Sequence, residues 1–182
     1  LVNPKHEAIR GLPCYPSVGA IGKALDLVVI AVPAEAVAGI MRECGDQGVG
    51  AAIIISAGFG EAGPQGQVLQ DEIVEIARRH NIALVGPNCL GVVRPRVGLN
   101  ASFARSRVSS GHVAMVAQSG SFCSALLDWA DARDFGFSAV ASLGATADVD
   151  FGEVLDYLAL DQYTKSILLY IEGVHNARSF MS

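Results

Sequence analysis

Short apolar runs alternate with helical patterns along this chain of 182 residues. The runs predict strands at residues 27–32, 51–55, 82–85, 113–117, 137–142 and 166–171. None of them alternates apolar and polar positions, which is typical of strands buried on both faces. Between them, apolar residues at helical spacing predict three helices, with stripes of Val37, Ile40, Met41 and Cys44, of Leu69, Ile73 and Ile76, and of Phe122, Ala125, Leu126, Trp129 and Ala130.

The strand–helix–strand order predicts an α/β protein with open, doubly wound parallel sheets, because right-handed crossovers place helices on both faces. Functional groups are then expected at the carboxyl ends of the strands. A stretch rich in arginine, serine and glycine at residues 94–111 interrupts the alternation. We therefore predict one unit at residues 1–100 and another at 108–182. The second holds few strand–helix units for an independent core, so we expect it to continue beyond Ser182 or to pack against a partner.

Composition narrows the class of protein. A content of 51% hydrophobic and 17% charged residues favours a folded chain over a disordered one. The formal net charge of -5 argues against a broad nucleic-acid-binding face. The longest apolar stretch is broken by charged residues and a proline well short of a membrane span, and no secretory signal precedes it. The cysteines lack metal-ligand spacing, which favours free thiols in a reducing cytosol. We expect a cytoplasmic protein without a membrane segment.

The sequence "VAQSGS" at residues 116–121 ends a predicted strand and begins the Trp129 helix. Free backbone N–H groups and the positive end of the helix dipole would point into the crevice at the strand ends. Glycine allows close backbone approach and the serines add hydroxyl donors, so a phosphoryl group is the natural occupant. The alternative is that Ser119 or Ser121 simply caps the helix. No GK[ST] ending follows, which excludes a nucleoside-triphosphate P-loop.

Two other predicted strands end in small residues. "SAGFGEAG" follows one at residues 56–63, and "GPNCLGV" follows another at residues 86–92. Either could be an ordinary glycine and proline turn. Together they favour a cofactor lying against the backbone at a shared edge.

These segments resemble the α-subunit type of nucleoside-diphosphate-forming acyl-CoA synthetases, which includes succinyl-CoA synthetase and the ADP-forming acetyl-CoA synthetases. The resemblance is carried, in order, by "NPK", "VPA", "SAGFGE", "GPNCLG", "AQSGS", "ADVDFGEVLDYLALD" and "LLYIEG", and it covers essentially the whole chain. It implies a Rossmann-like CoA-binding domain followed by a flavodoxin-like parallel α/β domain. Members make an acyl-CoA from a small carboxylic acid, CoA and ATP through an acyl phosphate and a phosphohistidine.

The resemblance implies a CoA site at the strand ends of the first unit. Its residues would be Lys5, Pro33, Ala34, Ser56, Ala57, Gly58, Phe59, Gly60, Glu61, Asn88 and Cys89. Lys5 would contact a CoA phosphate, since an ammonium group is a compact counter-charge. Asn88 and Cys89 would lie near the thiol end of CoA. For Cys89 we favour packing or substrate contact over a nucleophilic role, because no neighbouring base activates the thiol in sequence.

The resemblance also implies a phosphate site at Gln118, Ser119, Gly120 and Ser121, and a Glu172 that orients the phosphohistidine. ATP or ADP with Mg²⁺ would bind in an ATP-grasp domain or subunit outside this chain, and we expect an oligomer. Asp150 and Glu153 predict a capping box that starts the "EVLDYLAL" helix.

Departures from the family pattern shape the expectation. The chain begins after the point where members carry a first strand and a glycine-rich loop, and it ends before a histidine in a "SHTG" or "GHAG" setting. None of His6, His80, His112 or His175 fits that setting. We therefore expect the N- and C-terminal parts of the two domains to be missing, and a fragment inactive by itself. The alternative function is a non-catalytic, acyl-CoA-sensing regulatory region of a protein lysine acetyltransferase.

Overall fold

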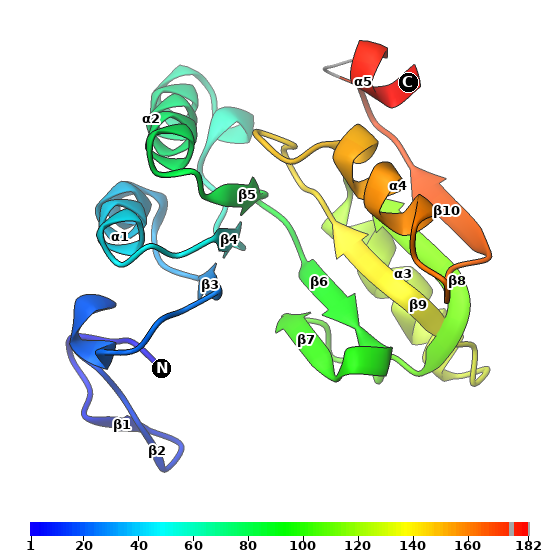
Figure 1. The fold of residues 1–182 in the computed structure, drawn as a ribbon, viewed down its shortest axis with the longest axis horizontal. Helices are drawn as coiled ribbons and strands as arrows, with labels where there is room; N and C mark the ends of the chain where they lie inside the picture. Colours follow the sequence, from blue (N-terminus) through cyan, green and yellow to red (C-terminus); the bar gives the residue numbers. More distant parts are fainter. Residues whose placement is uncertain (175–176, 182) are drawn as a thin grey trace.

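The computed structural model describes residues 1–174 and 177–181 (Figure 1). The strands are β1 (Ala8–Ile9), β2 (Leu12–Pro13), β3 (Leu27–Ile30), β4 (Ala51–Ile54), β5 (Ala83–Val85), β6 (Gly91–Arg94), β7 (Leu99–Ser102), β8 (Ser110–Ala117), β9 (Phe137–Ser142) and β10 (Ser166–Tyr170). The α-helices are α1 (Ala34–Asp46), α2 (Pro64–His80), α3 (Gly120–Asp131), α4 (Phe151–Ala159) and α5 (Ala177–Met181). Short 3-10 turns occupy Gly19–Ile21, Gly60–Ala62 and Pro95–Val97. Every strand predicted from an apolar run is present, which confirms the α/β class.

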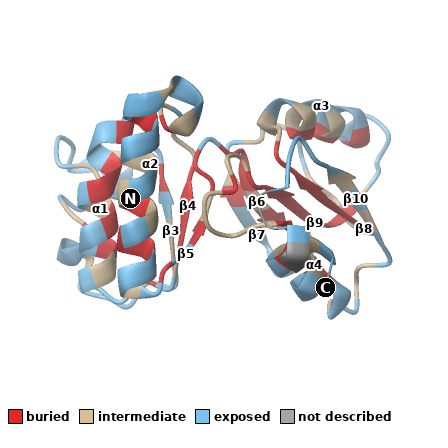
Figure 2. Cartoon of the chain, turned by 90° about the horizontal axis from the view of Figure 1, so that it is seen from above, coloured by how far each residue is buried: buried red, intermediate tan, exposed pale blue. Residues whose placement is uncertain are grey.

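The first sheet is parallel, in the order β3-β4-β5, and α1 and α2 cover one of its faces (Figure 2). Its core joins Val37 and Met41 of α1 to Ile73 of α2 and to Ile54 and Leu84 of the strands. The prediction of helices on both faces is wrong here. On the opposite face Ile53 packs with Cys89 and with Ala101 of β7, so residues beside and within strands β6 and β7 cover that face near Ile53.

The second sheet has the order β10-β8-β9-β6-β7. Its β10, β8 and β9 strands are parallel, and helices α3 and α4 lie on opposite faces, as the doubly wound prediction requires. The prediction of a purely parallel sheet is wrong, because β6 runs antiparallel to both β9 and β7. These two strands lie in the stretch 91–102, where no strand was predicted. They complete the second sheet although β6 begins before the arginine-rich junction and β7 lies within it.

Helix α3 buries a stripe that matches the predicted one only in part: Ala130 is buried, and Phe122 and Leu126 are partly buried against the same core. Cys123, Leu127 and Ala130 face the core, whereas Trp129 remains 46% exposed and Ala125 is exposed. The helix is apolar on more than one side, so periodicity alone could not select the buried side. Helix α4 begins as predicted, since Asp150 and Glu153 form a capping box.

The loop after β9 joins the two units through backbone hydrogen bonds. The N–H groups of Ala145 and Ala147 donate to the carbonyl oxygens of Pro87 (2.9 Å) and Gly86 (3.2 Å). The Asp148 carboxylate accepts from the Leu84 N–H at 3.1 Å, and Val149 N–H donates to the Leu84 oxygen at 3.1 Å. The loop therefore extends along the free edge of β5 and holds the strand ends of both sheets together.

No helix in residues 1–174 or 177–181 is long and apolar enough to cross a membrane.

Candidate functional site

A cavity of about 620 Å³ lies where the strand ends of the two sheets meet. This volume is within the range of small-molecule sites. Its walls come from both units: Ile55, Ala57, Glu61, Asn88, Cys89, Leu90, Phe103, Gln118, Ser119, Gly120, Ser121, Ser124, Gly144, Ala145 and Glu172. Segments that the sequence assigned separately to CoA, to phosphate and to Glu172 thus border a single space. Sequence reasoning missed Ile55, Leu90, Phe103, Ser124, Gly144 and Ala145, which carry no chemical signal of their own and enter the site only through tertiary packing.

The N-terminus of α3 forms one wall of the cavity. Ser119 is the N-cap residue, and its Oγ accepts a hydrogen bond from the Phe122 N–H at 3.2 Å. The capping alternative is therefore confirmed for Ser119. Among the residues that the structure describes, the backbone N–H groups of Ser119, Gly120 and Ser121 have no hydrogen-bond partner. Capping thus occupies one hydroxyl and leaves the amide donors facing the cavity, where an anion would be stabilised.

Glu172 reaches the same cavity from the turn after β10. Its backbone N–H donates to the Gln118 Oε1 at 2.6 Å, and the next N–H, of Gly173, donates to the same oxygen at 3.0 Å. Glu172 is exposed, so its carboxylate is available to a ligand in the cavity. By contrast, Gln118 is only 8% exposed, and its amide oxygen accepts both of these hydrogen bonds.

The Glu61 side chain stabilises the loop at residues 56–61, in which it lies. Glu61 Oε1 accepts from the Gly58 N–H at 2.6 Å, where Gly58 adopts a φ of 105°. Ala57 and Glu61 border the cavity, but Phe59 is fully buried in the core of the first unit. The Phe59 side chain therefore packs in the core and does not border the cavity. The buried Ser56 hydroxyl has no hydrogen-bond partner among the described residues.

The next strand end presents Asn88 and Cys89 to the cavity. Asn88 is exposed and holds a positive φ of 55°. Cys89 is 3% exposed, and its Sγ donates to the Ile54 carbonyl oxygen at 3.3 Å. Burial raises the pKa of the Cys89 thiol to about 11, so the thiolate is scarce at neutral pH. These features support packing rather than a nucleophilic role for Cys89.

Seven of the residues assigned to CoA are not in the lining of this cavity: Lys5, Pro33, Ala34, Ser56, Gly58, Phe59 and Gly60. Pro33 precedes α1 and is exposed, and Ala34 is buried beside the 56–61 loop, where a Cβ built on Gly58 would lie 3.2 Å from the Ala34 Cβ. Lys5 is exposed in the N-terminal segment, and its backbone N–H donates to the Asn3 side chain.

Comparison with known proteins places the chain in a family. The model described as "CoA binding domain" matches residues 1–95, and the model described as "Succinyl-CoA ligase like flavodoxin domain" matches residues 110–182. The chain belongs to the CoA binding domain family. Its second half is the flavodoxin domain of succinyl-CoA ligase type.

Two relatives of this chain are named as ligases. An ADP-forming acetate–CoA ligase I of Archaeoglobus fulgidus is 47% identical over 180 residues, which is 99% of this chain and 26% of that protein. The α subunit of an ADP-forming acetate–CoA ligase II from Pyrococcus furiosus is 39% identical over 99% of this chain and 39% of the subunit. The chain thus spans between a quarter and two fifths of these relatives.

A solved structure has the same fold. A dinucleotide-forming acetyl-coenzyme A synthetase 1 from Ca. Korarchaeum cryptofilum, in complex with phosphate and ADP, superposes with a TM-score of 0.93 at 35% identity. The similarity covers 99% of this chain and 39% of that one.

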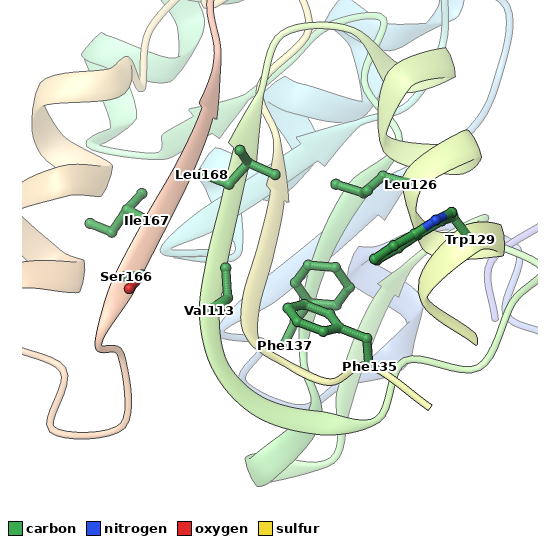
Figure 3. Close-up of a pocket in the computed structure, with 8 residues that line it drawn as sticks. All are labelled: Val113, Leu126, Trp129, Phe135, Phe137, Ser166, Ile167 and Leu168. Carbon is green, nitrogen blue, oxygen red and sulfur yellow. The ribbon is translucent and has the colours of Figure 1, made fainter. Parts of the chain in front are cut away.

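A second cavity of this CoA binding domain chain is apolar and differs in kind from the first. It has a volume of about 400 Å³ and lies between α3 and β10, lined by Val113, Leu126, Trp129, Phe135, Phe137, Ser166, Ile167 and Leu168 (Figure 3). Its lining is almost entirely apolar, and Trp129 and Ser166 are the lining residues whose side chains carry a polar group. This supports the polar cavity as the candidate site.

Among the described residues, His6, His80 and His112 are not in the lining of the polar cavity. His112 makes a hydrogen bond from Nδ1 to the Tyr163 carbonyl oxygen at 3.0 Å, and the His80 ring lies against Gly45. His175 lies outside the described residues. No group of three histidine, cysteine, aspartate or glutamate side chains within the described ranges could hold a metal ion.

Proposed function

We propose that this chain binds CoA and a phosphoryl group as part of an ADP-forming ligase that joins a small carboxylic acid, acetate in the first instance, to CoA. The single observation that carries the proposal is the shared cavity. It brings the 57–61 and 88–89 segments of the first unit against the α3 N-terminus and Glu172 of the second. The names of relatives at 47% and 39% identity support the same reaction.

The described residues suit the two ligand groups. The unpartnered N–H groups at residues 119–121 would hold phosphate oxygens, since donors at a helix N-terminus favour an anion. The small residues Ala57, Gly58 and Gly60 would let the CoA chain lie against the backbone. Asn88 and the neighbouring wall would then border the thiol end of CoA.

Each residue has a limited task in this proposal. Amide donors at α3 would stabilise charge on the phosphoryl group, and the Glu172 carboxylate would orient an imidazole that carries it. CoA supplies the thiol that accepts the acyl group. We assign ATP or ADP with Mg²⁺ to an ATP-grasp domain or subunit outside this sequence, together with the phosphorylated histidine, and we infer a cytoplasmic, oligomeric enzyme.

The test of CoA binding is calorimetric titration of the protein, expressed at the full length of its gene, with CoA and with NAD in separate runs. We expect saturable binding of CoA and none of NAD over the same concentrations. Equal binding of both, or binding of NAD alone, would show a general nucleotide-binding protein and contradict the proposal.

A matched pair of variants tests the phosphate wall. Ser121 is exposed at the first turn of α3, so Ser121→Asp keeps a helix-compatible residue there but places a negative charge at the anion site. Ser121→Asn has a similar shape without the charge. We expect Ser121→Asp to weaken binding of inorganic phosphate by about tenfold or more through like-charge repulsion, and Ser121→Asn to change it much less. Equal phosphate affinities for the two variants would show that phosphate does not bind at the N-terminus of α3.

A further inference from the structure

Gln118 occupies the point where three strand ends meet. It follows β8, and its backbone N–H donates to the Tyr170 carbonyl oxygen of β10 at 3.1 Å. Its Oε1 accepts from the Glu172 and Gly173 N–H groups at 2.6 and 3.0 Å. Its Nε2 donates to the Thr146 hydroxyl, in the loop after β9, at 3.5 Å. A single buried side chain therefore ties the turn after β10 to the ends of β8 and β9.

These contacts leave Gln118 poorly suited to hold phosphate. Phosphate oxygens require hydrogen-bond donors, and the amide oxygen of glutamine is only an acceptor. The backbone N–H is already bonded to β10, one of the two N–H donors of the side-chain amide faces Thr146, and the residue is only 8% exposed. The geometry favours a role for Gln118 that differs from the phosphate contact expected from the sequence.

The task concerns Glu172. Two successive N–H groups converge on one oxygen, which fixes the backbone at residues 172 and 173 beyond the last residue of β10. Among the described residues the Glu172 carboxylate makes no hydrogen bond or ion pair. The placement of Glu172 beside the cavity therefore depends on its backbone, which the two hydrogen bonds to Gln118 hold.

We propose that Gln118 is a positioning residue that acts through Glu172: its carboxamide fixes the turn after β10 so that the Glu172 carboxylate borders the cavity opposite the α3 amides. This inference rests on the proposed function for the meaning of Glu172, but it assigns a role that differs from phosphate binding. A buried amide that satisfies two backbone donors is costly to lose, because both donors would remain in a partly buried turn.

The test is a double-mutant cycle in the protein at the full length of its gene. Gln118→Met keeps the length of the side chain and removes its hydrogen bonds. Glu172→Gln removes the carboxylate charge. The assay follows CoA- and acetate-dependent formation of ADP from ATP. Exposed Gln47, at the end of α1, gives the matched control Gln47→Met, which should leave kcat unchanged.

If Gln118 acts through Glu172, Gln118→Met lowers kcat about tenfold or more with little change in the KM for CoA. The double variant is then no slower than Glu172→Gln, because the second change removes nothing further. Affinity for inorganic phosphate should stay within about twofold of the original protein in Gln118→Met, whereas a direct phosphate contact would lower it more, by the loss of a charge-assisted hydrogen bond.

Additive losses in the double variant, or a large loss of phosphate affinity in Gln118→Met, overturn the positioning role while leaving the proposed function standing. A protein that forms no ADP in the presence of acetate and CoA refutes the proposed function, and with it the inference. The two failures are therefore distinguishable by the activity of the unmodified protein.

Discussion

Gly144 offers the sharpest test of how the two units are joined. It has a φ of 56°, and a Cβ at this position would lie 2.2 Å from the Pro87 carbonyl oxygen and 2.5 Å from that of Asn88. Both obstacles are backbone atoms, so the Gly144→Ala variant can fit only if the loop moves away from residues 86–88. That movement would break the hydrogen bonds from Ala145 to Pro87 and from Ala147 to Gly86.

The expected cost can be separated into two parts. An alanine in the left-handed region costs about 1–2 kcal/mol from its own backbone. Each lost hydrogen bond adds about 1 kcal/mol, so Gly144→Ala should destabilise the protein by roughly 3–4 kcal/mol. Gly48 is the matched control, since it has a φ of 69° and a Cβ there would meet nothing within 4 Å. Gly48→Ala should therefore cost only the backbone part.

Urea unfolding followed by circular dichroism measures both variants, and hydrogen exchange of the Ala145 and Ala147 amides shows where the loss occurs. Exchange at these amides should increase in Gly144→Ala and stay unchanged in Gly48→Ala. Because Gly144 and Ala145 also line the cavity, CoA affinity should fall in the first variant only. Equal destabilisation by the two changes, with both amides still protected, would refute the account of the loop as the joint between the units.

Three further predictions concern buried groups. Cys44, Cys89 and Cys123 are buried and Cys14 is half-buried, so a thiol reagent at pH 8 should modify Cys14 first, and rapid labelling of all the thiols in the folded protein would contradict the structure. Burial raises the pKa of the Cys44 thiol from 9.0 to about 11, so the folded state holds this proton more tightly than the unfolded state does. The bound proton therefore stabilises the fold below pH 9. This contribution, up to about 3 kcal/mol, is lost between pH 9 and 11. Cys44→Ala should be less stable at pH 7 but lose less stability over that alkaline interval, and parallel profiles would argue against the raised pKa. Asp148→Ala should cost about 1–3 kcal/mol in urea unfolding by leaving the Leu84 N–H unpaired, whereas Asp148→Asn keeps an acceptor and should cost less; equal costs would remove the role of this contact.

The elements that the sequence predicted well have local causes. The strands from β3 to β5 and from β8 to β10 coincide with apolar, β-branched runs. The start of α4 follows from Asp150 and Glu153, which are close enough in sequence to cap it together. The strand ends that border the cavity were predictable from parallel topology, because carboxyl ends meet at one edge.

The misses have non-local causes. Strand β6 is short, is followed by Pro95, and pairs both with β7 and with β9, which lies more than forty residues later. Phe59 lies in a glycine-rich loop, a pattern that predicts exposure, but its side chain packs in the core formed by α1, α2 and the first sheet. The role of Gln118 depends on N–H groups 54 and 55 residues away, which no local motif encodes.

The placement of β6 has a consequence for how such proteins can be recombined. The first family model ends at residue 95, after β6, yet β6 pairs with β9, with Val92 opposite Ala141 and Val93 opposite Val140. A chimaera spliced between residues 95 and 110 would inherit β6 from one parent and β9 from the other, and would succeed only where those facing residues are compatible. A crossover between β5 and β6 instead takes every strand of the second sheet from the same parent protein.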